Sequence, residues 1–148
     1  MAKPTGFLET KRNNASYRDQ TDRTTDFKQV VLTIPDEELQ DQASRCMDCG
    51  IPFCSNPNSG RGGCPLGNVI PDWNDLVYRG KWEEAISRLH STNNFPEFTG
   101  SICPAPCESG CVLGINEEPV TIKNIEFKVV THGWENGYIK PVVAEKRT

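Results

Sequence analysis

The chain has 148 residues, of which 36% are hydrophobic and 24% are charged, so it can bury one small core and cannot be a large enzyme with its own nucleotide-binding fold. Sixteen Lys and Arg residues against twenty Asp and Glu residues give a formal net charge of -4 at pH 7, and no basic stripe of the kind that binds nucleic acid is present. No apolar run approaches the ~20 residues of a membrane-spanning helix, and the N-terminus lacks the apolar stretch of a signal peptide. We therefore expect a cytoplasmic protein without a membrane span or a nucleic-acid partner.

The first part of the chain combines a polar arm, one helix and a loop. Residues 1–32 are polar and charged with few apolar anchors, which predicts an extended arm. Residues 33–45 are predicted to form a helix, because acids follow a proline near its start and Arg45 ends it, the charge order that suits a helix dipole. Glycines and prolines crowd residues 50–67, which predicts loop backbone wrapped around a bound group.

Two consecutive helices are expected in the middle of the chain. Asn68 is the candidate N-cap of a helix over residues 68–79, and Gly80 stands where a left-handed stop belongs. In residues 81–91 apolar side chains recur at i, i+3, i+4 and i+7, which predicts a second amphipathic helix. An antiparallel pair of these helices is expected to supply most of the core.

The last third is predicted to be irregular before one final helix. Residues 93–106 are expected to lack regular structure and to lead into a short turn that carries Cys107 and Cys111. A last helix is predicted to begin at Thr121 and to end near His132. Because no alternating strand pattern persists anywhere, we expect an all-α fold with long loops.

Seven cysteines are the most informative feature of the composition, and their odd number argues against a closed disulfide framework. A Cys-x2-Cys step lets two thiolates reach one centre, a third thiol follows a few residues later, and the fourth ligand comes from elsewhere in the chain. Two of the cysteines precede proline, as in two-cluster ferredoxins, where such a cysteine ligates the other cluster. The cysteines are Cys46, Cys49, Cys54, Cys64, Cys103, Cys107 and Cys111.

Structural zinc is the main alternative on spacing alone, since it also accepts four thiolates. The third cysteine follows too soon for a zinc ribbon, a second Cys-x2-Cys knuckle is missing, and His90 and His132 do not stand at knuckle spacing. A thioredoxin-like motif is less favoured, because no strand precedes Cys46 and five other cysteines would go unexplained. The competing hypothesis is thus a zinc-binding structural module that docks subunits through its Trp73/Trp82 helical pair.

Two cuboidal clusters with four ligands each leave one position that seven cysteines cannot fill. Glu126 is the candidate, because it falls within the apolar stripe that Ile122, Ile125 and Val129 form on the last helix. An unpaired buried charge costs several kcal/mol. Glu126 is therefore expected to meet either an iron or a cation such as Arg or Lys.

Several stretches resemble one known family over nearly the whole chain. They are RCMDCGIPFC (45–54), GCPLGN (63–68), TNNFPEFTG (92–100), CPAPCE (103–108) and CVLGIN (111–116). These motifs are similar to those of the amino-terminal iron–sulfur domain of bacterial NADPH-dependent glutamate synthase small (beta) subunits. A related domain opens dihydropyrimidine dehydrogenase.

The resemblance implies an all-helical domain with two 4Fe-4S clusters. By the matched positions, one cluster takes Cys46, Cys49, Cys54 and Cys111, and the other takes Cys64, Cys103, Cys107 and a non-cysteine ligand. That last ligand is a glutamine in the dehydrogenase relative and aligns here with Glu126. The resemblance therefore implies the same carboxylate that the apolar stripe indicates.

The resemblance also implies a function that this chain cannot perform alone. Electrons would pass from NADPH-reduced FAD through both clusters to the glutamate synthase large subunit, which forms glutamate from glutamine and 2-oxoglutarate. FAD and NADPH would bind to an adjoining domain or partner. Within this chain, residues 1–32 are assigned to the arm, 33–132 to the domain that binds the two clusters, and 133–148 to a linker toward the FAD/NADPH domain. The chain is either one domain of a longer subunit or a free-standing version. The alternative is the electron-transfer subunit of another flavin-dependent oxidoreductase complex.

Overall fold

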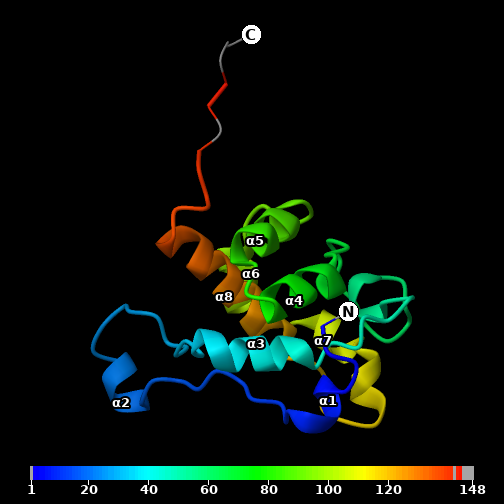
Figure 1. The fold of residues 1–148 in the computed structure, drawn as a ribbon. Helices are drawn as coiled ribbons and strands as arrows, with labels where there is room; N and C mark the ends of the chain where they lie inside the picture. Colours follow the sequence, from blue (N-terminus) through cyan, green and yellow to red (C-terminus); the bar gives the residue numbers. More distant parts are fainter. Residues whose placement is uncertain (1, 142, 145–148) are drawn as a thin grey trace.

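Residues 2–141 and 143–144 are described by a computed structural model, and within them the chain is helical (Figure 1). The elements in chain order are α1 (Gly6–Glu9), α2 (Gln20–Arg23), α3 (Asp36–Ser44), η1 (Phe53–Ser55), α4 (Ile70–Tyr78), α5 (Trp82–His90), α6 (Pro96–Ile102), α7 (Pro106–Ser109), η2 (Val112–Ile115) and α8 (Ile122–Glu135). In this part of the chain, β pairing is limited to one isolated bridge between Tyr17 and Val31. The predicted all-α fold class is confirmed.

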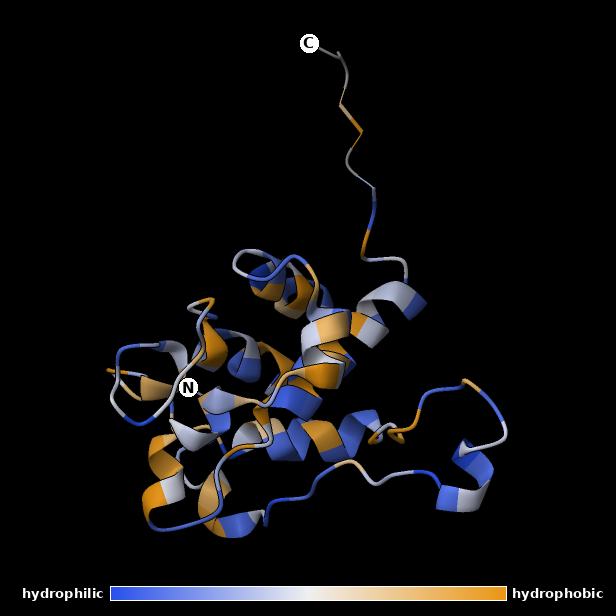
Figure 2. Ribbon diagram, turned by 180° about the vertical axis from the view of Figure 1, so that it is seen from behind, coloured by the Kyte–Doolittle hydropathy of each residue, from blue (hydrophilic) through white to orange (hydrophobic). Residues whose placement is uncertain are grey.

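The core lies between the longer helices. α4 packs against α3 and α5, and α8 packs against α5 and α6. These helices carry both polar and apolar residues (Figure 2), which lets one face enter the core while the other meets water. The predicted apolar face of α5 is buried, and it comprises Trp82, Ala85, Ile86 and Leu89. Trp82 also stacks on His132 of α8 with ring centroids 4.5 Å apart, so the last helix joins the predicted helical pair.

The start of α4 differs from the prediction. The N-cap position is Val69 rather than Asn68, and no side chain caps this end of the helix. Asn68 is buried, and its Oδ1 accepts a hydrogen bond from Thr92 Oγ1 at 2.7 Å. Its side chain therefore ties the segment after α5 to the start of α4. Gly80 has a φ of 70°, which confirms the left-handed stop.

The prediction that residues 93–106 are irregular is wrong, because α6 spans Pro96–Ile102 within them. Proline suits the first turn of a helix, but Thr99 and Gly100 both lower intrinsic helix propensity. α6 packs closely on α8, and a Cβ added to Gly100 would lie 2.8 Å from the Cα of Phe127. Tertiary packing therefore stabilises a helix that its own sequence signals weakly.

The ends of the predicted segments also differ in detail. α3 begins at Asp36, and α8 continues past its predicted end to Glu135. The predicted extended arm contains the single-turn helices α1 and α2. Of the predicted linker 133–148, residues 133–135 belong to α8, and Tyr138 and Ile139 pack against the core. The chain then leads away from the helical body (Figure 1), and positions 142 and 145–148 lie outside the described residues. Among the helices described, none is both long and apolar enough to cross a bilayer.

The close contact between α6 and α8 leads to a test by Gly100→Ala. The added methyl group would lie 2.8 Å from two Phe127 atoms, so we expect a loss of about 1–3 kcal/mol in the free energy of unfolding. Chemical denaturation of the anaerobically purified protein, followed by circular dichroism, measures this loss. The control is Gly114→Ala, whose methyl group would meet Pro119 at an ordinary 3.6 Å. Equal stability of the two variants would contradict the proposed contact.

Candidate metal centres

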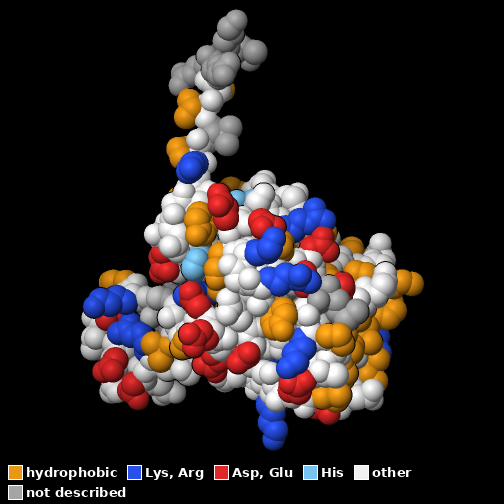
Figure 3. All heavy atoms as spheres, viewed as in Figure 1, with side chains coloured by type: hydrophobic (Ala, Val, Ile, Leu, Met, Phe, Trp, Pro, Cys, Tyr) orange, Lys and Arg blue, Asp and Glu red, His pale blue; other side chains and the backbone are white. Residues whose placement is uncertain are grey.

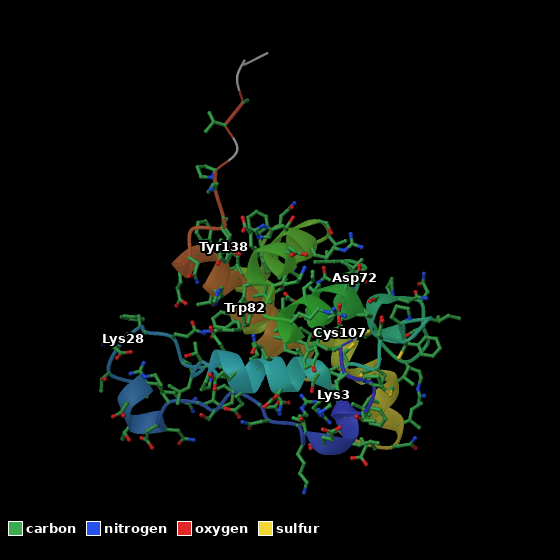
Figure 4. The ribbon with its side chains drawn as sticks, in the orientation of Figure 1. Lys3, Lys28, Asp72, Trp82, Cys107 and Tyr138 are labelled. Atoms are coloured by element: carbon green, nitrogen blue, oxygen red, sulfur yellow. The ribbon has the colours of Figure 1, made fainter. Side chains whose placement is uncertain are left out.

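The cysteines lie at one end of the molecule, in the segments around η1, α7 and η2. All seven are free thiols, and each is buried or partly buried. Figure 4 shows Cys107 at this end, on the opposite side of the molecule from Lys28 in the N-terminal arm. The helical body thus carries its sulfur donors together rather than spread over its surface.

Four cysteines face one apolar cavity. Cys46 and Cys49 follow α3, Cys54 lies in η1, and Cys111 precedes η2. The cavity is lined by Cys46, Met47, Cys49, Pro52, Phe53, Cys54, Pro71, Cys111, Val112, Leu113 and Val120. We call its four thiols the first set, and they are the four that the sequence resemblance assigns to one cluster.

The other three cysteines gather near Glu126. Burial, and next the neighbouring Glu108, raise the pKa of the Cys107 thiol. The negative charges of Cys64, Glu126 and Cys103 raise this pKa further, so all three groups lie within electrostatic reach of Cys107. We call Cys64, Cys103, Cys107 and Glu126 the second set.

Each set contains one strained turn that directs a backbone N–H toward a cysteine. Asp48 and Ala105 have φ values of 50° and 55°, a region that residues other than glycine rarely occupy. Ala105 N donates to Cys103 Sγ at 3.4 Å, and a backbone hydrogen bond from Asp48 favours the thiolate of Cys46. Both strained residues stand two positions after the cysteine that they contact. The backbone thus offers donors that stabilise sulfur in its charged, ligating form.

The glycine-rich loop between η1 and α4 brings the two sets side by side. The N–H of Cys64 donates to the carbonyl oxygen of Cys54 at 2.8 Å, which joins a member of the second set to a member of the first. The N–H of Gly63 donates to Pro106 at 3.0 Å, at the start of α7. A Cβ on Gly63 would lie 2.0 Å from the carbonyl oxygen of Asn56, and its φ is 138°. A larger residue would therefore prevent this close approach.

Burial suppresses ionisation of three thiols in the first set, Cys46, Cys49 and Cys54. It raises the pKa of Cys46 to about 11 and that of Cys54 to about 12, and it also raises the pKa of Cys49. Nearby thiols add to the effect, because like charges in one site repel each other. These three thiols are therefore protonated near neutral pH unless a positively charged centre replaces their protons, as metal binding does.

Glu126 lies on the buried face of α8 and is held through one carboxylate oxygen. Its Oε1 accepts hydrogen bonds from Asn93 Nδ2 at 3.2 Å and from Thr99 Oγ1. None of the ion pairs between described residues involves Glu126. Of the two predicted alternatives, an iron or a Lys or Arg side chain, the described residues therefore do not supply the second. Burial raises the pKa of the carboxyl group. Oε2 accepts no hydrogen bond from the part of the chain that the structure describes.

The donors fit iron–sulfur clusters better than single metal ions. Within the described residues, no three His, Cys, Asp or Glu side chains are placed to hold one metal ion. Structural zinc needs four donors about 2.0–2.3 Å from a single centre. In a 4Fe-4S cluster the ligands surround a larger group, and four thiols of this chain line one apolar cavity. The thiols, the carboxylate and the backbone N–H donors are chemically suited to such a group.

Arg45 lies beside the first set and is buried, in contrast to an ordinary surface cation. Its guanidinium donates to three backbone carbonyl oxygens, those of Thr10 at 3.0 Å, Pro119 at 2.9 Å and Glu118 at 2.7 Å. It also lies within electrostatic reach of Cys111. The side chain thus joins the N-terminal arm to the segment before α8 and brings positive charge to the first set.

Sequence reasoning missed the residues that hold Glu126. Asn93 and Thr99 both lie in the stretch predicted to be irregular, and both hydrogen-bond to the carboxylate from the α6 region. The TNNFPEFTG motif drew attention to these positions without indicating a role for them. A buried carboxylate on α8 calls for polar partners, but sequence separation hides which segment supplies them.

Comparisons with known proteins identify a 4Fe-4S domain family. Residues 23–138 match the family described as dihydropyrimidine dehydrogenase domain II, 4Fe-4S cluster. The chain is 52% identical to the glutamate synthase [NADPH] small chain of Bacillus subtilis, which aligns with 100% of this chain and 31% of that protein.

Two further relatives carry the same domain. The glutamate synthase [NADPH] small chain of Mycobacterium tuberculosis is 53% identical over 100% of this chain and 29% of its own length. The glutamate synthase [NADH] of Schizosaccharomyces pombe is 47% identical over 97% of this chain and 7% of its own length. The chain thus spans about a third of the length of the two bacterial relatives, or less.

The buried guanidinium leads to a test by Arg45→Ala. The change removes three hydrogen bonds and leaves the carbonyl oxygens of Thr10 and Glu118 without this donor, while Pro119 keeps a hydrogen bond from Arg12. We therefore expect a loss of at least about 3 kcal/mol in the free energy of unfolding. Arg79→Ala is the matched control, because Arg79 is half exposed and forms a surface pair with Asp75 worth about 0.5 kcal/mol. Denaturation midpoints of the two anaerobically purified variants give the comparison. A similar small loss in both would rule out a structural role for Arg45.

Proposed function

The chain belongs to the family of 4Fe-4S domains described as dihydropyrimidine dehydrogenase domain II, and from this premise we propose that it transfers single electrons through two 4Fe-4S clusters. The first set of thiols holds one cluster. The three thiols of the second set and Glu126 hold the other. When bound, the clusters supply the one-electron chemistry, and the protein supplies their position and surroundings.

The observation that carries this proposal is that two separate donor sets lie next to each other. The hydrogen bond between Cys64 and Cys54 joins the two sets directly. Cys107 and Cys111, one from each set, are separated by a single turn at the end of α7. Electron transfer between two centres benefits from such proximity, whereas two independent structural sites do not require it.

The residues around each set would give the two clusters different properties. The first set offers four thiols in an apolar cavity with Arg45 nearby. The second set offers a carboxylate in place of the fourth thiol, and Asn93 and Thr99 hold one oxygen of Glu126 in position. Ligand identity, hydrogen bonding and local charge set the potential of an iron–sulfur cluster. The two clusters are therefore expected to differ in potential.

The surface at the cysteine end is suited to a protein partner. Ile51, Leu66 and Ile115 are exposed there, and Figure 3 shows apolar side chains gathered over this side of the molecule. Exposed apolar groups of this kind mark interaction surfaces. An electron donor or acceptor docked at this end would lie near the clusters.

The names of the relatives indicate which proteins this chain would exchange electrons with. Two of them are named as glutamate synthase [NADPH] small chains. We propose that electrons come from NADPH through FAD on an adjoining domain or subunit and pass to a large subunit that forms glutamate from glutamine and 2-oxoglutarate. The chain has no turnover by itself in this scheme, and its cytoplasmic location stays a prediction.

The alternative functions have less support. A zinc-binding docking module would need the Trp73/Trp82 pair at its surface, but both side chains are buried in the core. A different flavin-dependent oxidoreductase complex would use the same clusters with other partners. Reduction of the purified domain by a glutamate synthase flavoprotein, compared with an unrelated one, separates that alternative from the proposal.

Two single substitutions test the two-cluster proposal. The anaerobically purified protein is expected to be brown, to bleach with dithionite and to contain about eight irons per chain. Cys49→Ser and Cys64→Ser should each lose about half of this iron, because each removes a ligand of a different cluster. Their electron paramagnetic resonance (EPR) spectra should lose different signals. A colourless protein with stoichiometric zinc, or full iron in both variants, would contradict the proposal.

Glu126 is tested separately by Glu126→Ala and Glu126→Gln. Alanine removes the ligand and should reduce the iron content or change the EPR signal of the second cluster alone. Glutamine keeps an oxygen at the same place, so it should retain this cluster with an altered potential. Iron analysis and EPR of the reduced variants are the measurements. Unchanged spectra in Glu126→Ala would restrict Glu126 to its hydrogen bonds with Asn93 and Thr99.

A further inference from the structure

Asn74 on α4 has a fully buried side chain whose amide group completes no hydrogen bond. Its Nδ2 and Oδ1 are two of the three buried side-chain polar atoms without a partner in the described part of the chain, and the third is Nε1 of Trp73. An unsatisfied buried polar group costs about 1–3 kcal/mol, and native proteins leave few such groups. The amide of Asn74 therefore calls for a hydrogen-bond partner beyond those that the described residues supply in normal geometry.

The position of Asn74 shows where that partner lies. Pro71, one turn earlier on the same face of α4, lines the cavity of the first set. α4 also packs against α3, whose end leads into Cys46. The Asn74 amide is close enough to the Cys46 sulfur to favour its thiolate, although it does not complete a hydrogen bond of normal geometry. The amide thus faces the first set from the protein interior.

We propose that Asn74 is a positioning residue for the first cluster, whose side-chain amide donates a hydrogen bond to the sulfur of the ligand Cys46. This inference rests on the proposed function, because it requires a cluster in the first set. An amide nitrogen carries two N–H donors and suits an electron-rich sulfur. The donation also satisfies a group that is otherwise buried without a partner.

The hydrogen bond has a defined effect on electron transfer. A reduced cluster carries one more negative charge than an oxidised one, so a fixed N–H donor stabilises the reduced state more strongly. Asn74 therefore raises the potential of the first cluster. Asn93 provides the corresponding amide near the second set, but it donates to Glu126 and Thr99. The effect of Asn74 is thus specific to the first cluster.

The experiment compares Asn74→Leu and Asn74→Asp with the unmodified chain. Leucine has a similar shape and no donor, and aspartate keeps the shape while losing the N–H groups. Redox titration followed by EPR should show the first signal shifted to lower potential in both variants, by about 59 mV for a tenfold change in the reduction equilibrium. The second signal should keep its midpoint and serves as an internal reference.

Asn68→Leu is the matched control. Asn68 is also a buried asparagine, but Thr92 already satisfies its Oδ1. Its replacement should reduce stability and leave the midpoint of the first signal unchanged. A shift as large as that of Asn74→Leu would overturn the assignment, since any buried asparagine would then have the same effect.

A second measurement on the unmodified protein covers variants that fail to load iron. Protein labelled with 15N in the side-chain amide of asparagine should show a 15N coupling on the EPR signal of the reduced first cluster. No such coupling, or unchanged midpoints in both Asn74 variants, would overturn the role of Asn74 while both clusters are present. Absence of both EPR signals from the unmodified protein would instead contradict the proposed function itself.

Discussion

The structure depends on bringing seven thiols and the buried carboxylate of Glu126 together from distant segments of a small helical body. The loops that carry the cysteines leave apolar side chains such as Ile51, Leu66 and Ile115 exposed, so packing alone does not hold their shape. Backbone hydrogen bonds help to hold these loops, such as those from the N–H of Cys64 to the carbonyl oxygen of Cys54 and from the N–H of Gly63 to the carbonyl oxygen of Pro106. Arg45 adds a buried guanidinium that joins three separate carbonyl groups. The helices α3, α4 and α8 then anchor these loops to the core.

The same constraint explains the chemistry of the donors. Burial raises the pKa values of Cys46 and Cys54 well above that of a free thiol, so these two donors are unfavourable as naked thiolates. A bound cluster would relieve this by replacing protons with iron, and its binding energy would then contribute to folding. The strained backbone at Asp48 and Ala105 is consistent with this view, because strain persists at sites where the surroundings impose it for function.

The order of residues predicted much of the fold, because its strongest signals are local. The helical face of α5 and the stop at Gly80 follow from side-chain spacing and from the backbone freedom of glycine. α6 was missed because Gly100 looks like a breaker, and only its contact with Phe127 explains why glycine is there. Asn68 was predicted to cap α4 because local sequence does not reveal its hydrogen-bond partner, Thr92, which lies on another segment.

The cysteine spacing alone determined that this chain is built to bind metal, and the apolar stripe on α8 singled out Glu126 as a buried carboxylate. Only the tertiary structure decided which residues meet the donors: Asn93 and Thr99 at Glu126, and the unpaired amide of Asn74 beside Cys46. The physical reason is that ligand spacing and helix periodicity depend only on residues that are close together in the sequence. Hydrogen bonding and burial depend on contacts between segments that the chain brings together only when it folds.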